Sequence, residues 1–491
     1  MKKIFLYSIT LALLAIGSGC KKDYLETNPS NQVSNAIIFS TTDGAFTAMD
    51  GVYRSYYTSL TNHGNFGQKS YDLVSDLMGN DMVVHTQGYG WFNAEYNYTA
   101  QLLATDNSRS ERMWWFYYRA INNANQIIVN IDGATGPQAD KDNIKGQALA
   151  LRAFSYYNLV NWFQQTYKGN ENKPGVPIYT TPTSEGGPRA SVEDVYKQVV
   201  ADLTEAENLL TGKARKHISH INANVVQGIM ARVALSMEDY SKAASYANKA
   251  RTGHAPMSAE QYKQGFSKMT DGNPEWLWGV EIITDQATIY ASFYSHMDVA
   301  TGGYAALGGQ KKITKALYDQ MGEADVRREV FQKPGTGTSA YPEYTQRKLR
   351  VPTPGSWAAD YLLMRSGEMY LIEAEALARS NSEAQAITVL ETLIRTRDAN
   401  YSAAGLSGTA LIDEILLQRR IELWGEGFGL MDIKRLKQPL ARPSGAGNHG
   451  IPNFNPGIFT LQPGEGKFLM RIPQREIDAN PNIDPSDQNP S

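Results

Sequence analysis

The chain has 491 residues, with 47 Lys and Arg against 50 Asp and Glu, and its formal net charge is −3. This balance leaves no basic excess for phosphate recognition, so it argues against a nucleic-acid partner. With 42% hydrophobic residues, the composition excludes a chain that is mainly disordered and a protein with many membrane spans. The length suffices for one large domain or two to three smaller ones, at roughly 100–200 residues per domain.

The first twenty residues have the pattern of a bacterial export signal. Two lysines precede Ile4–Ile16, an uncharged and mostly apolar run that is shorter than the roughly 20 residues needed to cross a bilayer. The small residues Gly17–Gly19 follow, and then Cys20, the only cysteine of the chain. A single cysteine cannot form an internal disulfide, and its position resembles a lipobox, in which the thiol is acylated after cleavage. We predict a signal peptide over residues 1–19, a lipid anchor on Cys20 and a polar tether over residues 20–35. An ordinary signal peptide with an incidental cysteine is the alternative.

Helical periodicity predicts a short block at about residues 40–60 and two main blocks of helices. The first main block, at about residues 108–251, contains predicted helices over 112–131, 143–163, 191–210, 224–236 and 240–251. The second, at about residues 360–436, begins with a helix at Asp360 and continues with helices over 383–398 and 411–424. Neighbouring helices with short connections resemble tetratricopeptide units of about 34 residues, although no fixed period links them.

Two long stretches between the helices have a different character. Residues 61–107 and 252–358 are irregular and rich in glycine and aromatic residues, and Trp276 to Ile283 alternates like a strand. They hold too many aromatic residues for a solvated tether, and long irregular segments on a rigid scaffold are usually functional. We therefore expect a mainly α fold with minor β structure, in which tetratricopeptide-like helix pairs and two large inserts form a single domain over residues 36–491.

The sequence offers few candidates for chemistry. Arg419 and Glu422 lie three residues apart on one predicted helix, which predicts a structural ion pair. His217 and His220 could ligate a metal, but no third ligand follows at a recognisable spacing, so we expect solvated loop histidines. No zinc-protease, nucleophile-elbow or phosphate-loop motif occurs. We predict no enzyme activity, no metal and no cofactor. A glycosidase-type pair of acids that meet only in the folded protein stays open.

The most informative cluster is aromatic. Five rings fall within ten residues, interleaved with glycines and asparagines: Tyr89, Trp91, Phe92, Tyr96 and Tyr98. This glycine spacing favours a loop, and exposed rings can stack on the apolar faces of sugars while Asn and Asp side chains bind the hydroxyls. The candidate ligand-binding residues are Asp81, Tyr89, Trp91, Phe92 and Asn93 in the first insert and Tyr304, Tyr341, Tyr344 and Trp357 in the second. The alternative is that these rings only anchor the loops to the scaffold.

Five segments stand in order behind the predicted lipobox: Trp115–Asn125, Gly146–Tyr156, Tyr361–Ala376, Arg419–Gly427 and Met470–Pro481. Together they resemble the SusD/RagB family of outer-membrane nutrient-binding lipoproteins, and they extend over nearly the whole chain. One position departs from the family pattern. An arginine usually stands two residues after the Glu-Gly pair, where this chain has Gly429, and this affects the charge network expected there.

The resemblance implies an α-helical scaffold with four tetratricopeptide-like pairs and large inserts that carry the ligand site. It also implies an outer-membrane lipoprotein that faces the cell exterior, sits over a TonB-dependent, SusC-like transporter and delivers its ligand to it. Most studied members bind oligosaccharides, and some are thought to bind peptides. We therefore predict capture of an oligosaccharide nutrient, because aromatic rings beside Asn and Asp favour a sugar. Peptide capture, and a helical-repeat interaction scaffold without a small ligand, stay open as alternatives.

Overall fold

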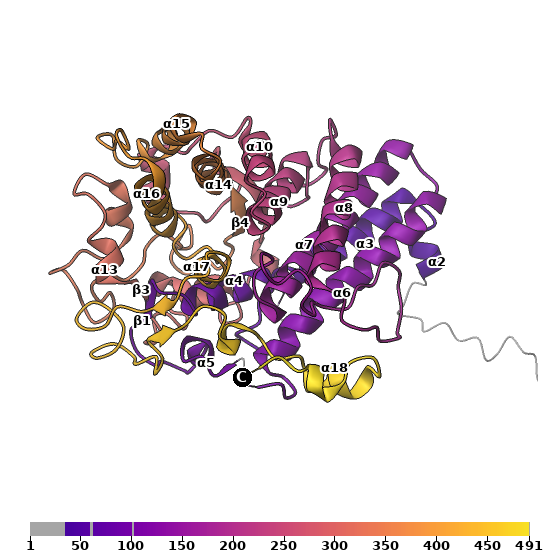
Figure 1. The fold of residues 1–491 in the computed structure, drawn as a ribbon, viewed down its shortest axis with the longest axis horizontal. Coiled ribbons are helices and arrows are strands. Elements are labelled where there is room, and N and C mark those ends of the chain that lie inside the picture. Colours follow the sequence, from indigo (N-terminus) through magenta and orange to yellow (C-terminus); the bar gives the residue numbers. More distant parts are fainter. Residues whose placement is uncertain (1–34, 59–61, 101–102, 491) are drawn as a thin grey trace, which may run out of the picture.

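The computed structural model describes residues 35–58, 62–100 and 103–490. The predicted signal peptide, Cys20 and nearly all of the predicted tether lie outside these residues. The α-helices (Figure 1) are α2 (Asn35–Ile38), α3 (Thr42–Ser55), α4 (Gln68–Leu77), α5 (Asn93–Tyr96), α6 (Arg109–Asn130), α7 (Gln138–Phe163), α8 (Val192–Leu210), α9 (Ala223–Ser236), α10 (Tyr240–Arg251), α11 (Ala259–Gln264), α12 (Phe293–Met297), α13 (Lys315–Tyr318), α14 (Ser366–Arg379), α15 (Glu383–Ile394), α16 (Gly408–Glu422), α17 (Gly429–Arg435) and α18 (Gln474–Ala479). The strands are β1 (Met82–Val84), β2 (Trp276–Val280), β3 (Lys311–Ile313), β4 (Tyr361–Arg365), β5 (Leu440–Ala441) and β6 (Thr460–Leu461). This mainly helical architecture confirms the predicted fold class.

Four of the five helices of the first main block begin at a capping side chain. Ser108 accepts a hydrogen bond from the Glu111 amide at the start of α6, and Ser191 accepts one from the Asp194 amide at the start of α8. Asn222 and Asp239 cap α9 and α10 in the same way, as polar residues commonly do at helix starts. Helix α7 instead follows Pro137 without a side-chain cap. The predicted pairs α6 with α7 and α9 with α10 are thereby confirmed, since each pair packs together across a short connection.

The second main block starts later than predicted. Residues Tyr361–Arg365 form β4, which pairs antiparallel with β2, and the helix α14 begins only at Ser366. The prediction of a helix from Asp360 was therefore wrong, whereas the predicted strand is confirmed over Trp276–Val280. Every residue of β4 is buried, and a short apolar run of this kind has no periodicity that separates a buried strand from a helix.

A buried cluster of ion pairs joins the second insert to the second helical block. It consists of Glu275, Asp325, Arg327 and Lys348 from the insert and Arg365, Arg397, Glu422 and Glu426 from the strand and helix ends around α14–α16, and each side chain is at most 6% exposed. Four cations thus meet four anions, which is the condition under which buried charges are tolerated. Burial alone would raise the pKa of Glu426, but Arg365 and Lys348 outweigh it and lower this pKa to about 2.

The prediction that Arg419 and Glu422 form an ion pair with each other was wrong, because each pairs with other residues. Glu422 accepts hydrogen bonds from Arg365 and Arg397, while the Nε atom of Arg419 lies 2.7 Å from Asp432. Both side chains are buried, Arg419 at 3% and Glu422 at 0% exposure, in ion pairs within the scaffold.

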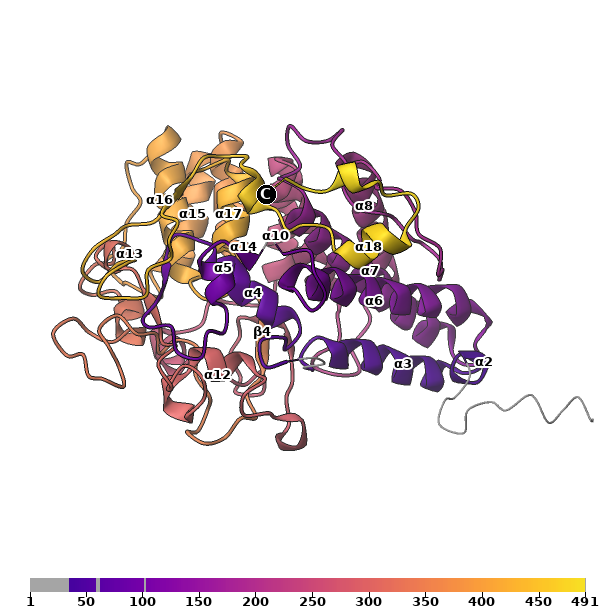
Figure 2. The same ribbon diagram turned by 90° about the horizontal axis from the view of Figure 1, so that it is seen from below.

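The elements are arranged with helices along one side and the irregular segments on the other. In Figure 2 the segments of the second insert gather around α12, below the helices α14–α17, and the helices α3 and α6–α8 extend toward the opposite end. Strand β1 of the first insert pairs antiparallel with β3 of the second, with Met82 opposite Ile313 and Val84 opposite Lys311. This pairing fixes the two inserts against each other. Within the described residues, no helix is both long enough and apolar enough to span a membrane.

Candidate functional site

Five rings from separate segments of the two inserts meet beside α5 and α12. We call them the aromatic platform: His63, Tyr89, Trp91, Tyr290 and Tyr304. Tyr304 is central, since its ring centroid lies 5.6 Å from that of Trp91, 5.5 Å from that of Tyr89 and 5.3 Å from that of Tyr290. The ring of His63 stacks on Tyr290 at 5.7 Å, and its Nδ1 lies 2.6 Å from the Tyr304 hydroxyl oxygen.

The platform faces solvent to different degrees across its width. Tyr89 is 70% exposed and Tyr290 is 42% exposed, and the neighbouring Ile289 and Leu307 are also exposed. Trp91 and Tyr304 are half-buried between these rings and the interior. Large exposed apolar side chains that cluster on a surface mark a binding site more often than isolated ones do. The geometry therefore offers a surface on which flat apolar faces of a ligand can stack.

The β1–β3 pairing brings the loops that carry the rings together. Beyond β1, the His85 amide donates to the Gln310 carbonyl at 3.0 Å, and the Thr86 hydroxyl donates to the Gly308 carbonyl. Gly88 has φ 51°, and a Cβ atom there would lie 3.1 Å from the Gly309 nitrogen, so glycine permits this close approach. The two glycine-rich loops are thus held as one unit with Tyr89 at its edge.

Trp91 and Tyr304 rest on a buried floor. A Cβ atom on Gly64 would lie 3.2 Å from the Trp91 ring, so the absence of a side chain there lets the indole pack onto the backbone. His296 stacks under Tyr304 with ring centroids 5.0 Å apart, and its Nε2 donates to the His63 carbonyl at 2.9 Å. Burial, and secondarily the charge of Lys311, lower the pKa of His296 to about 3, so this imidazole is neutral at physiological pH.

The structure brings three of the candidate ligand-binding residues together, namely Tyr89, Trp91 and Tyr304. Two neighbours in the first insert face the interior instead. Phe92 adopts a left-handed conformation (φ 64°), which turns its ring inward against His296 at 4.9 Å, and it is only 3% exposed. Asn93 is buried and donates to the Gln87 carbonyl at 3.1 Å. The expectation that Phe92 and Asn93 offer an exposed ring and amide was therefore wrong; they support the loop.

The remaining candidates of the second insert lie apart from the platform. Tyr344 is buried and packs edge-on against Tyr318, which corrects the expectation of an exposed ring. Tyr341 is half-buried beneath the guanidinium of Arg347. Trp357 lines a separate cavity of about 220 Å³ together with Tyr57 and Tyr361.

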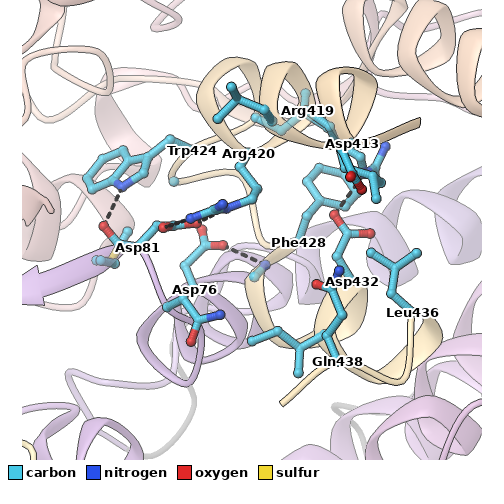
Figure 3. A pocket seen from close by; sticks show the side chains of 18 residues that line it. Asp76, Asp81, Asp413, Arg419, Arg420, Trp424, Phe428, Asp432, Leu436 and Gln438 are labelled. Atoms are coloured by element: carbon cyan, nitrogen blue, oxygen red, sulfur yellow. Dashed lines mark hydrogen bonds and ion pairs between the residues drawn. The ribbon is translucent and has the colours of Figure 1, made fainter. Parts of the chain in front are cut away.

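Asp81 lies at a different cavity of about 260 Å³ between β1, α16 and α17 (Figure 3). Arg420 points across this cavity from α16 and binds both carboxylate oxygens of Asp81, at 2.9 and 2.6 Å. The Asp81 carbonyl also accepts a hydrogen bond from the Trp424 indole at 3.0 Å. Because its carboxylate is fully occupied by an arginine, Asp81 ties the first insert to α16 rather than extending the aromatic platform.

Gly429, the position that departs from the family pattern, lines the same cavity. The amides of Gly427 and Gly429 donate to the carboxylate of Asp76 at 2.8 and 3.0 Å. A Cβ atom on Gly429 would lie 3.1 Å from the Ser75 carbonyl oxygen, so the backbone approaches α4 closely at this point. Backbone donors at Gly427 and Gly429 thus hold the Asp76 carboxyl group, whose pKa burial raises to about 7, without an arginine side chain at position 429.

The two histidines considered as metal ligands have carboxylate partners. His220 is only 4% exposed, and its Nε2 lies 2.8 Å from Asp50. His217 lies 3.2 Å from Glu281. The expectation of two solvated histidines was therefore wrong for His220, which lies between α3 and the start of α9.

Sequence signals did not identify His63 and Tyr290 as platform residues. Each lies in an irregular segment outside the glycine-interleaved run around Tyr89 and Trp91, and His63 is 241 residues away from its partner Tyr304. The sequence shows only that both residues belong to the two inserts, whose aromatic content predicts a functional role for the inserts as a whole.

Fold and site together define a class of protein: a tetratricopeptide-like helical scaffold that displays an exposed aromatic surface on two inserts. Residues 23–235 match a family model described as "Starch-binding associating with outer membrane", and residues 335–491 match the model of the SusD family. A crystal structure of a SusD-like carbohydrate binding protein from Bacteroides vulgatus is 30% identical, covers 92% of this chain and 99% of its own, and superposes with a TM-score of 0.82. The chain belongs to the SusD family.

Two further relatives extend this comparison. SusD-like protein P2 from Formosa agariphila is 25% identical over 532 residues, and the match covers 99% of both chains. Surface glycan-binding protein A from Bacteroides thetaiotaomicron is 18% identical, with a TM-score of 0.70 over 92% of this chain, and shares the fold.

Proposed function

We propose that this protein captures an oligosaccharide nutrient at the cell surface and delivers it to a TonB-dependent outer-membrane transporter. The observation that carries the proposal is the aromatic platform, where Tyr89 and Tyr290 remain exposed although three other rings support them. Sugars present apolar C–H faces on which aromatic rings stack. The hydroxyl of a tyrosine at the same time offers a hydrogen bond to the sugar. The 30%-identical relative named a carbohydrate binding protein supports a sugar as the ligand.

The proposed role is binding without chemical change of the ligand. Two imidazoles belong to the site: His63 in the platform, whose Nδ1 lies 2.6 Å from the Tyr304 hydroxyl, and His296 beneath it, which is neutral and whose Nε2 donates to the His63 carbonyl. A general acid or base would instead need a proton-transfer atom directed at the ligand. The platform thus suits capture and release.

Anchoring to the outer membrane is part of the same proposal and depends on Cys20. Acylation of this cysteine, together with the predicted tether, would hold the domain at the surface while leaving it free to meet a transporter. More than one acyl chain is needed for stable anchoring, which lipoprotein maturation supplies.

The test is a glycan array probed with the chain from residue 21 onward. We expect binding to a limited set of oligosaccharides, and loss of that binding in the double variant Tyr89→Ala/Tyr290→Ala. Incubation with the selected oligosaccharide should leave it intact. A silent array combined with binding to a peptide library would contradict sugar capture, as would full retention of binding by a folded double variant. Copurification of the tagged full chain with a TonB-dependent barrel tests the delivery step.

A further inference from the structure

A large cavity lies away from the aromatic platform. It is a groove of about 780 Å³ between α6, the loop of residues 179–186 and α18. Figures 1 and 2 both show α18 beside α6, and the Trp114 indole of α6 donates to Glu476 of α18 at 3.2 Å. The groove is therefore built by three segments that are distant in the sequence.

One face of α6 supplies the floor of the groove. Arg112, Trp115, Arg119 and Asn122 follow one another at helical spacing, so their side chains share this face. Trp115 is 45% exposed, which is unusual for so large an apolar side chain. The guanidinium of Arg119 lies 5.1 Å from the Trp115 ring centroid and covers part of it.

The walls of the groove are fixed by hydrogen bonds. Asn125 of α6 donates to the Tyr179 carbonyl at 2.9 Å, and the Tyr118 hydroxyl donates to the Pro177 carbonyl at 2.8 Å. On the other side, Asn480 donates to the Gly187 carbonyl at 2.9 Å. The cavity is thus present before any ligand binds, which lowers the entropic cost of binding.

Arg112 is the group in this groove that the fold leaves unsatisfied. Its Nε is buried without a hydrogen-bond partner, and its guanidinium forms no ion pair among the described residues. Burial, and then the nearby charge of Arg109, lower the pKa of Arg112. A partly buried cation next to another cation destabilises the folded state unless an anion joins it.

Most of the other charged groups that line the groove have partners, whereas Arg119 rests on Trp115 and Glu185 forms no ion pair among the described residues. Arg475 binds Asp106 at 2.7 Å and Glu111 at 3.3 Å. Glu476 accepts hydrogen bonds from the Trp114 indole and from the Asn480 amide. Within the described residues, the fold therefore supplies Arg112 with a nearby cavity and an exposed aromatic ring, while Glu95 and Glu111 attract it from a distance without forming an ion pair.

We propose that this groove is a second binding site, which takes a sugar unit bearing a carboxylate, that is, a uronic acid residue of a glycan. Its carboxylate pairs with Arg112, whose planar fork matches two carboxylate oxygens, and the sugar ring lies on the free part of Trp115. Asn122 is exposed on the same face and is available to a hydroxyl. This site goes beyond the proposed capture at the aromatic platform, because it adds a second point of contact and selects for charge.

The test uses the purified full chain in detergent and titration calorimetry with short oligomers of glucuronate, galacturonate, mannuronate and guluronate. Carboxyl-reduced, neutral forms of the same oligomers serve as matched ligands. We expect at least one uronate oligomer to bind, and its neutral form to bind at least tenfold more weakly. Arg112→Gln and Trp115→Ala should each weaken uronate binding at least tenfold, whereas Tyr89→Ala should change it less than threefold.

Arg475→Gln is the control within the groove, since its guanidinium is already paired, and it should change affinity less than threefold. Because Arg112 has no partner in the fold, Arg112→Gln should melt at the same temperature as the wild type or higher. The proposal is overturned if none of the four uronates binds, or if a folded Arg112→Gln variant retains full affinity. It is also overturned if uronate binding is lost in Tyr89→Ala but not in Arg112→Gln. A short peptide with a free C-terminal carboxylate is titrated in parallel, and tighter Arg112-dependent binding of this peptide than of every uronate would overturn the proposal as well. Loss of platform binding alone, with Arg112-dependent uronate binding intact, would refute only the proposed capture at the platform.

Discussion

Substituting Tyr89 with alanine separates ligand binding from folding at the aromatic platform. The Tyr89 side chain is 70% exposed, and within the part of the chain that the structure describes its one ring contact is an edge-on approach to Tyr304 at 5.5 Å. Such a pair contributes about 0.5–1.5 kcal/mol, so Tyr89→Ala should shift the melting temperature of this large domain by less than about 2 °C. If the ring stacks on a sugar, the loss of affinity should reach about 2 kcal/mol, or roughly thirtyfold, when measured by calorimetry with the array-selected oligosaccharide.

Two variants calibrate this result. Ile37→Ala removes a 65% exposed apolar side chain on α2, at the other end of the long axis in Figure 1, and should change neither quantity. Trp91→Ala should weaken binding and also lower the melting temperature by several degrees, because its ring packs against Gly64 and Tyr304. Unchanged affinity in a folded Tyr89→Ala variant would remove this ring from the site, and a large drop in its melting temperature would show that it anchors the loop.

Three further predictions follow from the scaffold and the anchor. Glu422→Gln removes the charge of one of the two carboxylates that Arg365 and Arg397 share, the other being Glu275, so urea unfolding should show a loss of about 3–5 kcal/mol; a loss below about 1 kcal/mol would refute the role of the cluster. His296 takes up a proton at its ordinary pKa of about 6.5 when unfolded but only at about 3 when folded. The free energy of unfolding should therefore fall by about 1.4 kcal/mol per pH unit as the pH decreases between these values. In His296→Gln this contribution to the pH dependence should be absent, and equal slopes in the variant and the wild type would contradict a neutral buried His296. Cys20→Ala should release the protein from membranes, and retention in the detergent fraction would rule out lipidation at this residue.

Local patterns in the sequence predicted most of the scaffold. Periodic apolar residues predicted the bounds of α6–α10 to within a few residues. Capping residues such as Ser108 and Asn222 stand directly before two of these helices. The start of α14 was missed because Tyr361–Met364 is a continuous run without polar side-chain alternation, and only the pairing of Tyr361–Arg365 with β2 makes it a strand. The partners in the buried cluster could not be predicted either, because Glu275 and Glu422 are brought together by tertiary packing alone.

The site was predictable in outline and not in detail. The glycine-rich spacing around Tyr89 and Trp91 indicated an exposed aromatic loop, and the structure places both rings beside Tyr304. The same pattern could not show that Phe92 turns inward, because that depends on one left-handed backbone angle. Tyr290 reaches the platform only through the fold of the second insert, and nothing next to it in the sequence signals this.

A crystal structure of the protein with the oligosaccharide selected on the array would locate the bound sugar. We expect sugar rings lying on Tyr89, Tyr290 and Tyr304, within van der Waals contact of their faces. An oligosaccharide bound elsewhere on the scaffold, with these three rings left bare, would contradict this expectation.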